Sequence, residues 1–233
     1  MAKNYCLTSP CPSLPGGGVC APSSVWIMTK GLFITDIGTD VGKTVAAAVM
    51  AKALEADYWK PVQCGDLDNS DSIKIARLSG LKTLPEAYKL QAPMSPHAAA
   101  ELEGIELSID AIELPRSEKP IVVEGAGGVM VPMNSTQTYL DLMVKLNLPV
   151  VLVTRHYLGS INHTMLSWKM LKAAGLNVVA LVISGTQHAS TESYFAMQMD
   201  VPFIRINELG EVSSETIAAE AERLHSSIKA LIA

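Results

Sequence analysis

Residues 35–44 read TDIGTDVGKT and lie between a β-prone run at 31–35 and an alanine-rich, helix-prone run at 45–57. A turn between a strand and a helix binds a polyphosphate when small residues let backbone N–H groups point inward, a lysine reaches the outer phosphates and a hydroxyl meets Mg²⁺. Gly42, Lys43 and Thr44 supply these groups, and the following helix adds the positive end of its dipole. Ile37 occupies the place of the first glycine of the strict motif. The sequence therefore predicts a variant phosphate-binding loop, the alternative being a βα turn without function.

Beyond this loop, short apolar runs alternate with longer amphipathic stretches. The apolar runs predict strands at 58–62, 120–123, 149–154, 178–183 and 202–206. The amphipathic stretches predict helices at 69–79, 139–146, 161–174, 191–199 and 215–232. This alternation is typical of an α/β protein with a doubly wound, mainly parallel sheet flanked by helices, as in P-loop NTPases. We expect a single domain over residues 28–233, whose least regular part is the proline-containing segment 80–115.

The composition is that of a globular protein, because 48% of the 233 residues are hydrophobic and 18% are charged. Disordered chains combine low hydrophobicity with a high net charge, so that class is excluded. The formal net charge of −5 argues against a broad nucleic-acid-binding face, and no apolar run approaches the roughly 18 residues of a membrane span. We therefore expect neither a nucleic acid nor a membrane as a partner.

The first 27 residues differ in composition from the rest of the chain. They hold three of the four cysteines, and their prolines and glycines interrupt any apolar core of an export signal. We interpret this segment as a flexible leader, a mis-assigned start or an artificial extension, with Met28 as the candidate start. A cytoplasmic location with reduced thiols is expected. A metal site at Cys6, Cys11 and Cys20 is the less favoured alternative, because these cysteines lack the close paired spacing of metal ligands.

Three charged residues stand at the ends of predicted elements. Glu124 ends the apolar run 121–123 and precedes four small residues, which is the place of a Mg²⁺-binding acid; a surface salt bridge is the alternative. Lys60 ends a short predicted strand, and ligands of α/β proteins gather outside the carboxyl ends of strands, although most lysines are merely solvated. Asp71 falls in the first turn of a predicted helix, where its position alone favours a role in complementing the helix dipole.

Six short motifs follow one another along the chain: GTDVGKT at 38–44, KPVQ at 60–63, NSD at 69–71, SPH at 95–97, EGAGG at 124–128 and LGSINH at 158–163. This ordered set resembles dethiobiotin synthetase, and the resemblance runs from about residue 31 to the C-terminus. It implies ATP- and Mg²⁺-dependent carboxylation of 7,8-diaminononanoate with CO₂ or bicarbonate, a step of biotin biosynthesis. In this family an amine captures CO₂ as a carbamate, ATP phosphorylates the carbamate, and the second amine closes the ureido ring.

The resemblance also implies roles for individual residues. Lys60 would be the catalytic lysine, Lys43 would join it at phosphate and carbamate, and Thr39 would lie at the junction of the two. The Mg²⁺ shell would be formed by Thr44, Asp71 and Glu124. The residues implied in ATP binding are Asp40, Val41, Gly42, Lys43, Thr44, Val45, Asp71, Glu124, Gly125, Ala126, Gly127, Ser184, Gly185, Asn207, Glu208 and Leu209.

Two positions depart from the family pattern. Cys64 stands where relatives usually carry a small hydroxyl residue that touches the diamine or carbamate, and a thiol is a weaker hydrogen-bond donor. Ser184 and Gly185 stand where many relatives have an asparagine that reads adenine. Base recognition is therefore expected from backbone groups around Ser184 and around 207–209.

A further substrate contact is expected at the start of the helix that follows residue 159. Ser160, Ile161 and Asn162 open this predicted helix, and its free N–H groups would bind the substrate carboxylate; a simple capping role for Ser160 is the alternative. In the family this turn comes from the neighbouring subunit, which implies a homodimer with shared sites.

Two other enzyme classes share the variant loop. A cobyrinate-type ligase with amidotransferase activity would need a glutaminase part with a nucleophilic cysteine, for which 233 residues leave no room. A partitioning or cell-division-site ATPase would typically carry an extra lysine early in the loop, and its membrane-binding relatives a basic amphipathic helix. Residues 215–233 mix acidic and basic side chains instead.

Overall fold

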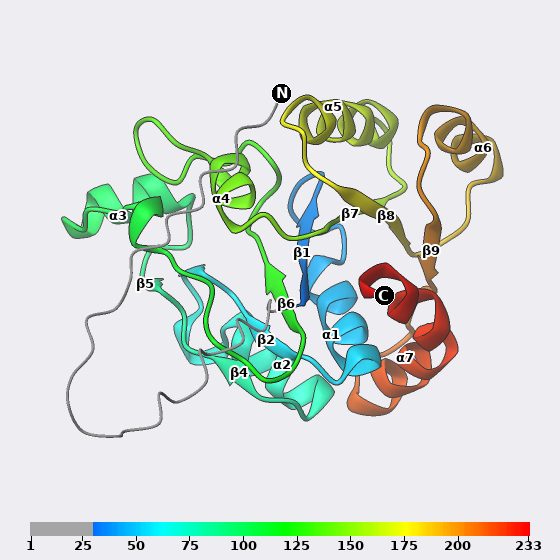
Figure 1. Ribbon diagram of the computed structural model, residues 1–233, viewed down its shortest axis with the longest axis horizontal. Helices are drawn as coiled ribbons and strands as arrows, with labels where there is room; N and C mark the ends of the chain where they lie inside the picture. The colour runs from blue at the N-terminus through cyan, green and yellow to red at the C-terminus, as the bar shows by residue number, and fades with distance from the viewer. Residues whose placement is uncertain (1–29) are drawn as a thin grey trace, which may run out of the picture.

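β1 (Gly31–Asp36) is the middle strand of a seven-stranded parallel sheet in the computed structural model, which describes residues 30–233 (Figure 1). The strand order is β4-β2-β6-β1-β7-β8-β9, and each neighbouring pair is parallel. The other strands of this sheet are β2 (Asp57–Trp59), β4 (Thr83–Leu84), β6 (Ile121–Glu124), β7 (Val150–Arg155), β8 (Val178–Ser184) and β9 (Phe203–Ile206). Because parallel strands end at the same edge, the loops that follow them converge there.

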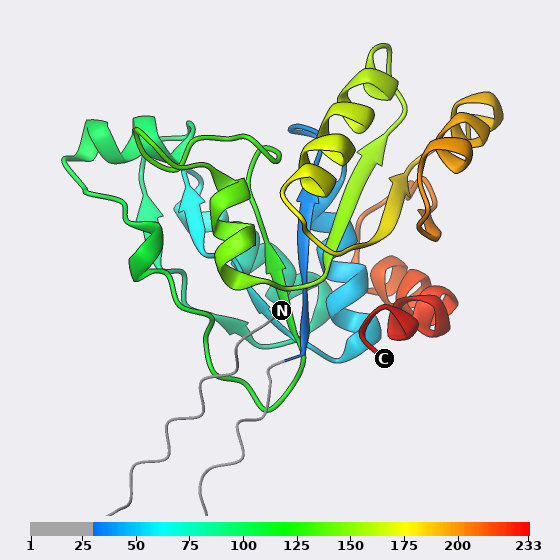
Figure 2. The same ribbon diagram turned by 45° about the horizontal axis from the view of Figure 1, so that its top comes forward.

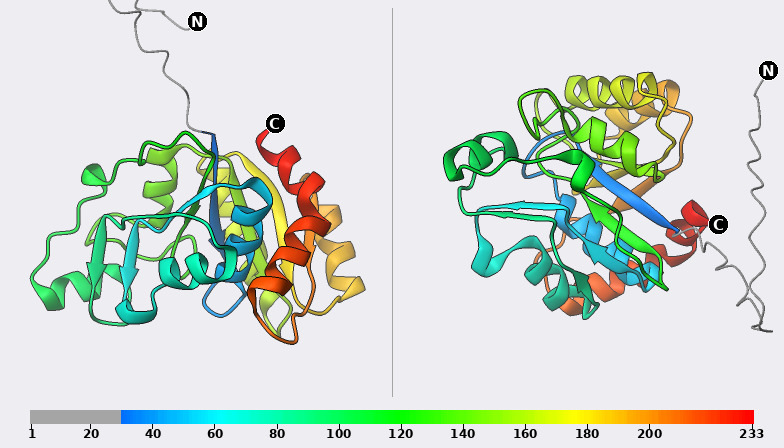
Figure 3. Two further views of the ribbon diagram at one scale, coloured as in Figure 1. Left: turned by 90° about the horizontal axis from the view of Figure 1, so that it is seen from below. Right: turned by 60° about the vertical axis from the view of Figure 1, so that its left-hand side comes forward.

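Helices cover both faces of this sheet. One layer consists of α1 (Lys43–Leu54), α2 (Asp71–Ser79) and α7 (Ser214–Lys229), onto which the left view of Figure 3 looks. The other layer contains α4 (Tyr139–Leu146), α5 (Ser160–Ala173) and α6 (Ala189–Gln198), and Figure 2 brings it forward. Side chains alternate between the two apolar cores, as a strand requires: Leu32 and Ile34 face the first layer, and Phe33 faces the second.

The alanine-rich helix α1 is buried between the sheet and α7. Its residues Ala46 to Ala51 are all inaccessible to solvent, and it contacts both α7 and β6. Small side chains allow this close approach, and alanine has the highest helix propensity. The helix that follows the phosphate-binding loop is therefore held rigidly against the sheet.

The predicted fold class is confirmed, and most predicted elements occur within a few residues of their expected bounds. The run 58–62 is an exception, because it divides into β2 and β3 (Val62–Cys64). Pro61 lies at the break, where it has no N–H to donate to a ladder. β3 then pairs with β5 (Tyr88–Leu90) in a separate two-stranded parallel sheet.

The segment 80–115 contains more structure than its sequence indicated. It includes β4, β5, the helix α3 (Pro96–Glu103) and a 3₁₀ turn (Ile109–Ala111). At the other end of the chain, α7 is followed by a 3₁₀ turn (Ala230–Ile232) instead of continuing as one helix to 232. The expectations for residues 1–27 and for Met28 lie outside the described residues. Among residues 30–233, no helix is long and apolar enough to cross a lipid bilayer.

Candidate active site

The loop at 37–42 joins β1 to α1 at the carboxyl edge of the sheet. Gly42 precedes the first turn of α1 with a φ of 88°, a left-handed conformation that glycine adopts without strain. A Cβ atom at this position would also lie 2.6 Å from the Ser184 hydroxyl at the end of β8. Thr39 and Asp40 are exposed in this loop, whereas Val41 is buried and Val45 packs against the same core. The structure thus has the strand, turn and helix that the sequence predicted for a phosphate-binding loop.

The first two residues of α1 face the end of β6. Lys43 Nζ lies 3.5 Å from Glu124 Oε1, and Thr44 Oγ1 lies 3.2 Å from the same oxygen. β6 is the direct neighbour of β1 in the sheet, with Glu124 in register with Ile34. The two loops that follow these strands are therefore side by side, and this places Lys43 and Thr44 next to Glu124.

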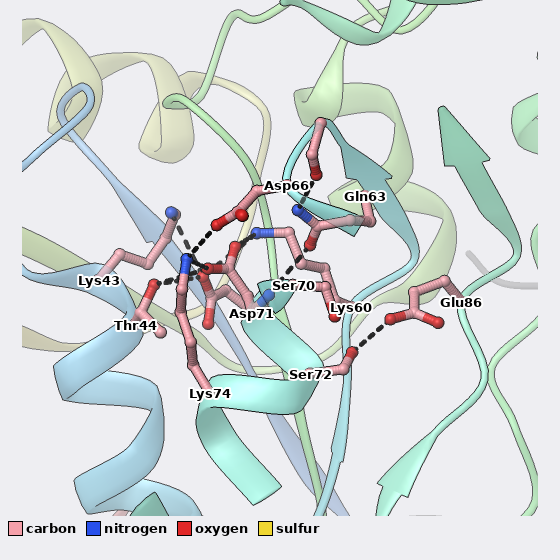
Figure 4. A network of polar contacts seen from close by, with 12 residues as sticks. Lys43, Thr44, Lys60, Gln63, Asp66, Ser70, Asp71, Ser72, Lys74 and Glu86 are labelled. Atoms are coloured by element: carbon pink, nitrogen blue, oxygen red, sulfur yellow. Dashed lines mark hydrogen bonds and ion pairs between the residues drawn. The ribbon is translucent and has the colours of Figure 1, made fainter. Parts of the chain in front are cut away.

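Lys60 and Asp71 complete a buried charged cluster (Figure 4). Lys60 follows β2 and is only 4% exposed; its ammonium contacts Asp71 Oδ2 and lies 3.4 Å from Glu124 Oε1. Asp71 is the first residue of α2, and its Oδ1 lies 3.5 Å from Thr44 Oγ1. The cap of α2 is Ser70, whose hydroxyl accepts a hydrogen bond from the Ile73 N–H. Asp71 thus lies in the first turn, as its position indicated, and also points into the cluster.

Opposite charges set the protonation of this cluster. Burial acts to raise the pKa of Asp71, but the ammonium groups of Lys60, Lys43 and Lys74 outweigh burial and lower it. Burial acts to lower the pKa of Lys43, and the carboxylates of Glu124, Asp36 and Asp71 raise it above its ordinary value. Asp71 is therefore ionised and Lys43 is charged at neutral pH.

Glu124 is held by a residue that the sequence analysis did not select. Glu124 is fully buried, which excludes the alternative of a surface salt bridge, and its Oε2 accepts a 2.9 Å hydrogen bond from the Tyr58 hydroxyl. Burial, with the nearby charge of Glu124, raises the pKa of Tyr58 well above its ordinary value, so the phenol stays protonated and donates. Tyr58 lies in β2 in register with Val122 of β6. A buried tyrosine needs a partner for its hydroxyl, and that requirement is the sequence signal for its role.

Asp36 is a second residue that the sequence analysis did not select. It is the last residue of β1, is 1% exposed, and its Oδ2 lies 3.3 Å from Lys43 Nζ. Burial raises its pKa from 3.8 to about 6, although the neighbouring Lys43 acts in the opposite direction. Its sequence signal is the same as that of Glu124: an acid at the carboxyl end of an apolar strand.

A cavity of about 420 Å³ adjoins this cluster and is lined by Thr39, Lys60, Gln63, Cys64, Asp71, Pro93, Met94, Ser95, Pro96, Ala126, Gly127 and Val131. Gln63 accepts a 3.3 Å hydrogen bond from the Asp71 N–H and donates a 2.9 Å bond to the Gly65 carbonyl, so it ties the start of α2 to the cavity wall. Burial raises the pKa of Cys64 to about 11, so its thiol is protonated at neutral pH. Gly125 lies at the end of β6, where its N–H donates to the Ile34 carbonyl.

The residues expected around the adenine are partly assembled near Gly42. Ser184 approaches Gly42 as described above, and a Cβ atom on Gly185 would lie 2.6 Å from Glu208 Oε2. Glu208 also forms a 3.0 Å ion pair with Arg155. The remaining two residues are engaged elsewhere: Asn207 donates from both its backbone and its side chain to Glu220, and Leu209 packs against the core on the α7 side.

The turn at the start of α5 lies outside the cavity that Lys60 lines. Ser160 is buried, and its hydroxyl accepts from the Tyr157 N–H at 3.3 Å, whereas Ile161 and Asn162 are exposed. Ser160 and Ile161 line a separate cavity of about 440 Å³ next to His156. Within one chain, the structure therefore does not bring this turn to the charged cluster.

Comparison with known proteins decides between the enzyme classes that share this loop. The family model described as an AAA domain matches residues 30–227. The ATP-dependent dethiobiotin synthetase of Christiangramia forsetii is 53% identical over 169 residues, which are 71% of this chain and 81% of that protein. The chain belongs to the dethiobiotin synthetase family. A dethiobiotin synthetase of Rhodopseudomonas palustris is 42% identical over 196 residues, covering 82% of this chain and 92% of that protein.

Solved structures outside the dethiobiotin synthetases share the fold. The septum site-determining protein MinD of Pyrococcus horikoshii, in complex with Mg-ADP, superposes with a TM-score of 0.53 at 16% identity over 88% of this chain and 99% of that one. The cell division ATPase MinD of Pyrococcus furiosus gives 0.55 at 14% identity, over 86% of this chain and all of that one. At such identities the likeness shows the P-loop NTPase fold alone.

Proposed function

We propose that this protein is an ATP-dependent dethiobiotin synthetase that converts 7,8-diaminononanoate, CO₂ and ATP into dethiobiotin, ADP and phosphate in the cytoplasm. The observation that carries the proposal is that two ammonium groups, the buried Lys60 and the half-buried Lys43, converge beside a cavity. Lys43 and Lys60 both lie within 3.5 Å of Glu124 Oε1, and Lys60 also lines the cavity of about 420 Å³. Membership of the dethiobiotin synthetase family supplies the reaction.

The reaction places several negative charges at one point. One substrate amine attacks CO₂ and loses a proton, which forms an N–C bond and a carbamate anion. A carbamate oxygen then attacks the γ-phosphorus of ATP, and ADP leaves. The second amine attacks the carbonyl carbon of this mixed anhydride, and phosphate leaves as the ring closes. Positively charged groups that are fixed in advance stabilise such charge more than groups that must reorganise, and Lys43 and Lys60 would serve this role.

The oxygen atoms of Thr44, Asp71 and Glu124 suit a Mg²⁺ ion. Thr44 Oγ1 lies 3.2 Å from Glu124 Oε1 and 3.5 Å from Asp71 Oδ1, close to the spacing of about 3 Å between neighbouring ligands on a Mg²⁺ octahedron. Among residues 30–233, no group of three or more His, Cys, Asp or Glu side chains forms a metal site. Thr44, Asp71 and Glu124 offer only a few protein oxygens, which matches Mg²⁺ because this ion keeps water and phosphate oxygens in its shell. When bound, the ion would neutralise phosphate charge.

We extend the proposal to a homodimer in which Ser160, Ile161 and Asn162 of one chain bind the substrate carboxylate held near Lys60 of the other. The exposed apolar side chains along and before α5 support a covered face: Leu158 is fully exposed, Leu166 is 62% exposed, and Ile161 is 41% exposed. The Ser160 N–H donates to the Tyr157 carbonyl at 3.0 Å, so the N–H groups of Ile161 and Asn162 are the ones at the start of α5 that suit a carboxylate.

The reaction is tested by measuring phosphate release from ATP with bicarbonate, with and without 7,8-diaminononanoate, together with the mass of the product. We expect phosphate release that depends on the diamine and a product with the mass of dethiobiotin. Equal turnover with an unrelated amine, or stimulation by DNA or lipid vesicles instead of the diamine, would contradict the proposal.

The shared site is tested by mixing two inactive variants. Lys43→Ala removes the phosphate contact, and Ile161→Glu places a negative charge at an exposed position of the proposed carboxylate site. Mixed dimers contain one site with both halves intact, so activity should partly return on mixing. Lys229→Glu, on the exposed surface of α7 in the other helix layer, is the matched control and should leave the diamine KM unchanged. No recovery despite demonstrated subunit exchange would refute the shared site.

A further inference from the structure

The carboxylate of Asp36 is buried in an unbalanced environment. Its Oδ2 forms an ion pair with Lys43 Nζ at 3.3 Å. Its Oδ1 is buried and has no hydrogen-bond partner among residues 30–233. A buried carboxylate oxygen without a donor is costly, so the Asp36 side chain depends on the Lys43 ammonium for most of its compensation.

Lys43 is shared between two carboxylates. Asp36 approaches it from the end of β1, and Glu124 approaches it at 3.5 Å from the end of β6. The other titratable groups near Asp36 are Lys60, which follows β2 and whose charge lowers the Asp36 pKa, and Tyr157, which follows β7 and whose pKa the charge of Asp36 helps to raise. In a phosphate-binding loop, however, this lysine is the group that must reach the outer phosphates of the nucleotide.

We propose that Asp36 is a positioning residue that holds the Lys43 ammonium until a nucleotide arrives, and that the phosphates bind by taking Lys43 from it while Asp36 accepts a proton. This inference rests on the proposed function only in so far as the loop binds a nucleotide. It adds a residue that acts through Lys43 and touches neither ATP nor the diamine.

The uptake of a proton by Asp36 follows from the geometry of the site. Once phosphate oxygens share the Lys43 ammonium, Asp36 retains a buried carboxylate with one unpaired oxygen and a weakened counter-ion, close to new negative charge. Buried carboxylates without a counter-ion take up a proton, because burying the neutral form costs less free energy than burying the charged form. The proton comes from solvent or buffer, so each binding event converts one carboxylate to a carboxylic acid and deprotonates one buffer molecule. Even with Lys43 beside it, the Asp36 pKa of about 6 is already raised toward neutrality.

Calorimetric titration with the non-hydrolysable ATP analogue AMPPNP and Mg²⁺ tests this inference without any turnover. Heats measured in buffers of different ionisation enthalpy report the number of protons taken up on binding. We compare the wild-type protein with Asp36→Asn, which keeps the shape of the side chain and removes its charge. Asp57→Asn is the matched control, because Asp57 is a buried carboxylate at the start of β2, at the opposite edge of the sheet from Asp36, where it accepts a 2.8 Å hydrogen bond from Ser117.

The wild-type protein and the Asp57→Asn control should take up about one proton more per nucleotide than Asp36→Asn at about pH 8. The association constant of Asp36→Asn divided by that of the wild type should rise about tenfold for each pH unit above about 7, as long as Asp36 is ionised in the free protein and protonated in the complex. The titration of the nucleotide itself cancels in this ratio. A structural role alone would change the affinity by a factor independent of pH.

Equal proton uptake by the wild type and Asp36→Asn, or a ratio that does not change with pH, would overturn the inference. If Asp36→Asn fails to fold, Asp36→Ala is compared with the wild type in the same way, and equal proton uptake by these two proteins at about pH 8 refutes the proposal. Failure of the proposed function is a separate outcome. A chain that binds AMPPNP with proton uptake but makes no dethiobiotin keeps this inference and loses the proposed function, and a chain that binds no nucleotide loses both.

Discussion

Replacing Tyr58 with phenylalanine tests whether Glu124 is oriented by its buried hydrogen bond. The Tyr58 hydroxyl donates to Glu124 Oε2 at 2.9 Å, and the other oxygen, Oε1, faces Thr44, Lys43 and Lys60. The substitution removes one oxygen atom from a fully buried site and leaves the ring in place. Its effects therefore report the hydrogen bond and not a cavity.

The magnitude follows from the charge and burial of the acceptor. A hydrogen bond to a charged group contributes about 1.5 to 3 kcal/mol, and a fully buried carboxylate has no water to replace the lost donor. For a protein of this size, that loss lowers the unfolding midpoint by about 3 to 12 °C. Loss of a group that orients a metal ligand typically weakens metal binding about 10- to 100-fold, so the Mg²⁺ concentration for half-maximal turnover should rise by that factor.

Tyr139→Phe is the matched control for this measurement. Tyr139 is also fully buried, and its hydroxyl has no hydrogen-bond partner among residues 30–233. Removing that hydroxyl should leave stability unchanged or slightly increased, with the wild-type Mg²⁺ dependence. Thermal unfolding and Mg²⁺ titration of diamine-dependent phosphate release measure both quantities. If Tyr58→Phe behaves like Tyr139→Phe in both assays, the hydrogen bond does not position Glu124 and the reasoning is refuted.

Three further predictions concern single positions. Lys60→Ala should lower diamine-dependent turnover about 10²-fold or more and also lower the unfolding midpoint, because it leaves the buried Glu124 and the half-buried Asp71 without their shared cation. Near-normal turnover would remove Lys60 from the site. Gly42→Ala should weaken nucleotide binding in a calorimetric titration, because its φ of 88° strains alanine and the new methyl group meets the Ser184 hydroxyl; unchanged affinity would show that the loop has room. Asp36→Asn should raise the unfolding free energy at neutral pH by up to about 3 kcal/mol. A carboxyl whose pKa is raised from 3.8 to about 6 by folding destabilises the protein above pH 6 and contributes no penalty below 3.8, so the gain should vanish in acid denaturation curves below that pH.

The fold was predictable from the sequence wherever burial dominates local structure. The runs that became β6, β7 and β8 are continuous and apolar because both of their faces are covered by helices. The strands of the segment 80–115 were not predictable in this way. β4 has two residues and β5 has three, and β5 exposes Lys89. Strands so short give no period, and their pairing with distant partners stabilises them.

The candidate site was also only partly predictable from the sequence. The proximity of Lys43, Lys60 and Glu124 was predictable, because Glu124 ends a strand of the parallel sheet, Lys60 and Lys43 come after two others, and all such strand ends meet at one edge. The partners within the cluster were not predictable, because they depend on strand order. Tyr58 reaches Glu124 only because β2 lies next to β6 in the sheet, although β6 begins, at Ile121, more than sixty residues further along the chain. Without that order, Tyr58 is one more aromatic residue in a strand.

The charges of the cluster have a consequence for how ligands bind. The ammonium groups of Lys43 and Lys60 face the carboxyl groups of Asp36, Asp71 and Glu124, so each lysine forms ion pairs with two carboxylates. When a lysine turns to a phosphate, the carboxylate that it paired with loses its counter-ion, and another positive charge must replace the lysine there. Mg²⁺ can replace it at Asp71 and Glu124, and a proton can replace it at Asp36. Nucleotide, metal and proton are therefore expected to bind as one coupled event, in which the nucleotide raises the affinity for Mg²⁺ by the same factor by which Mg²⁺ raises the affinity for the nucleotide.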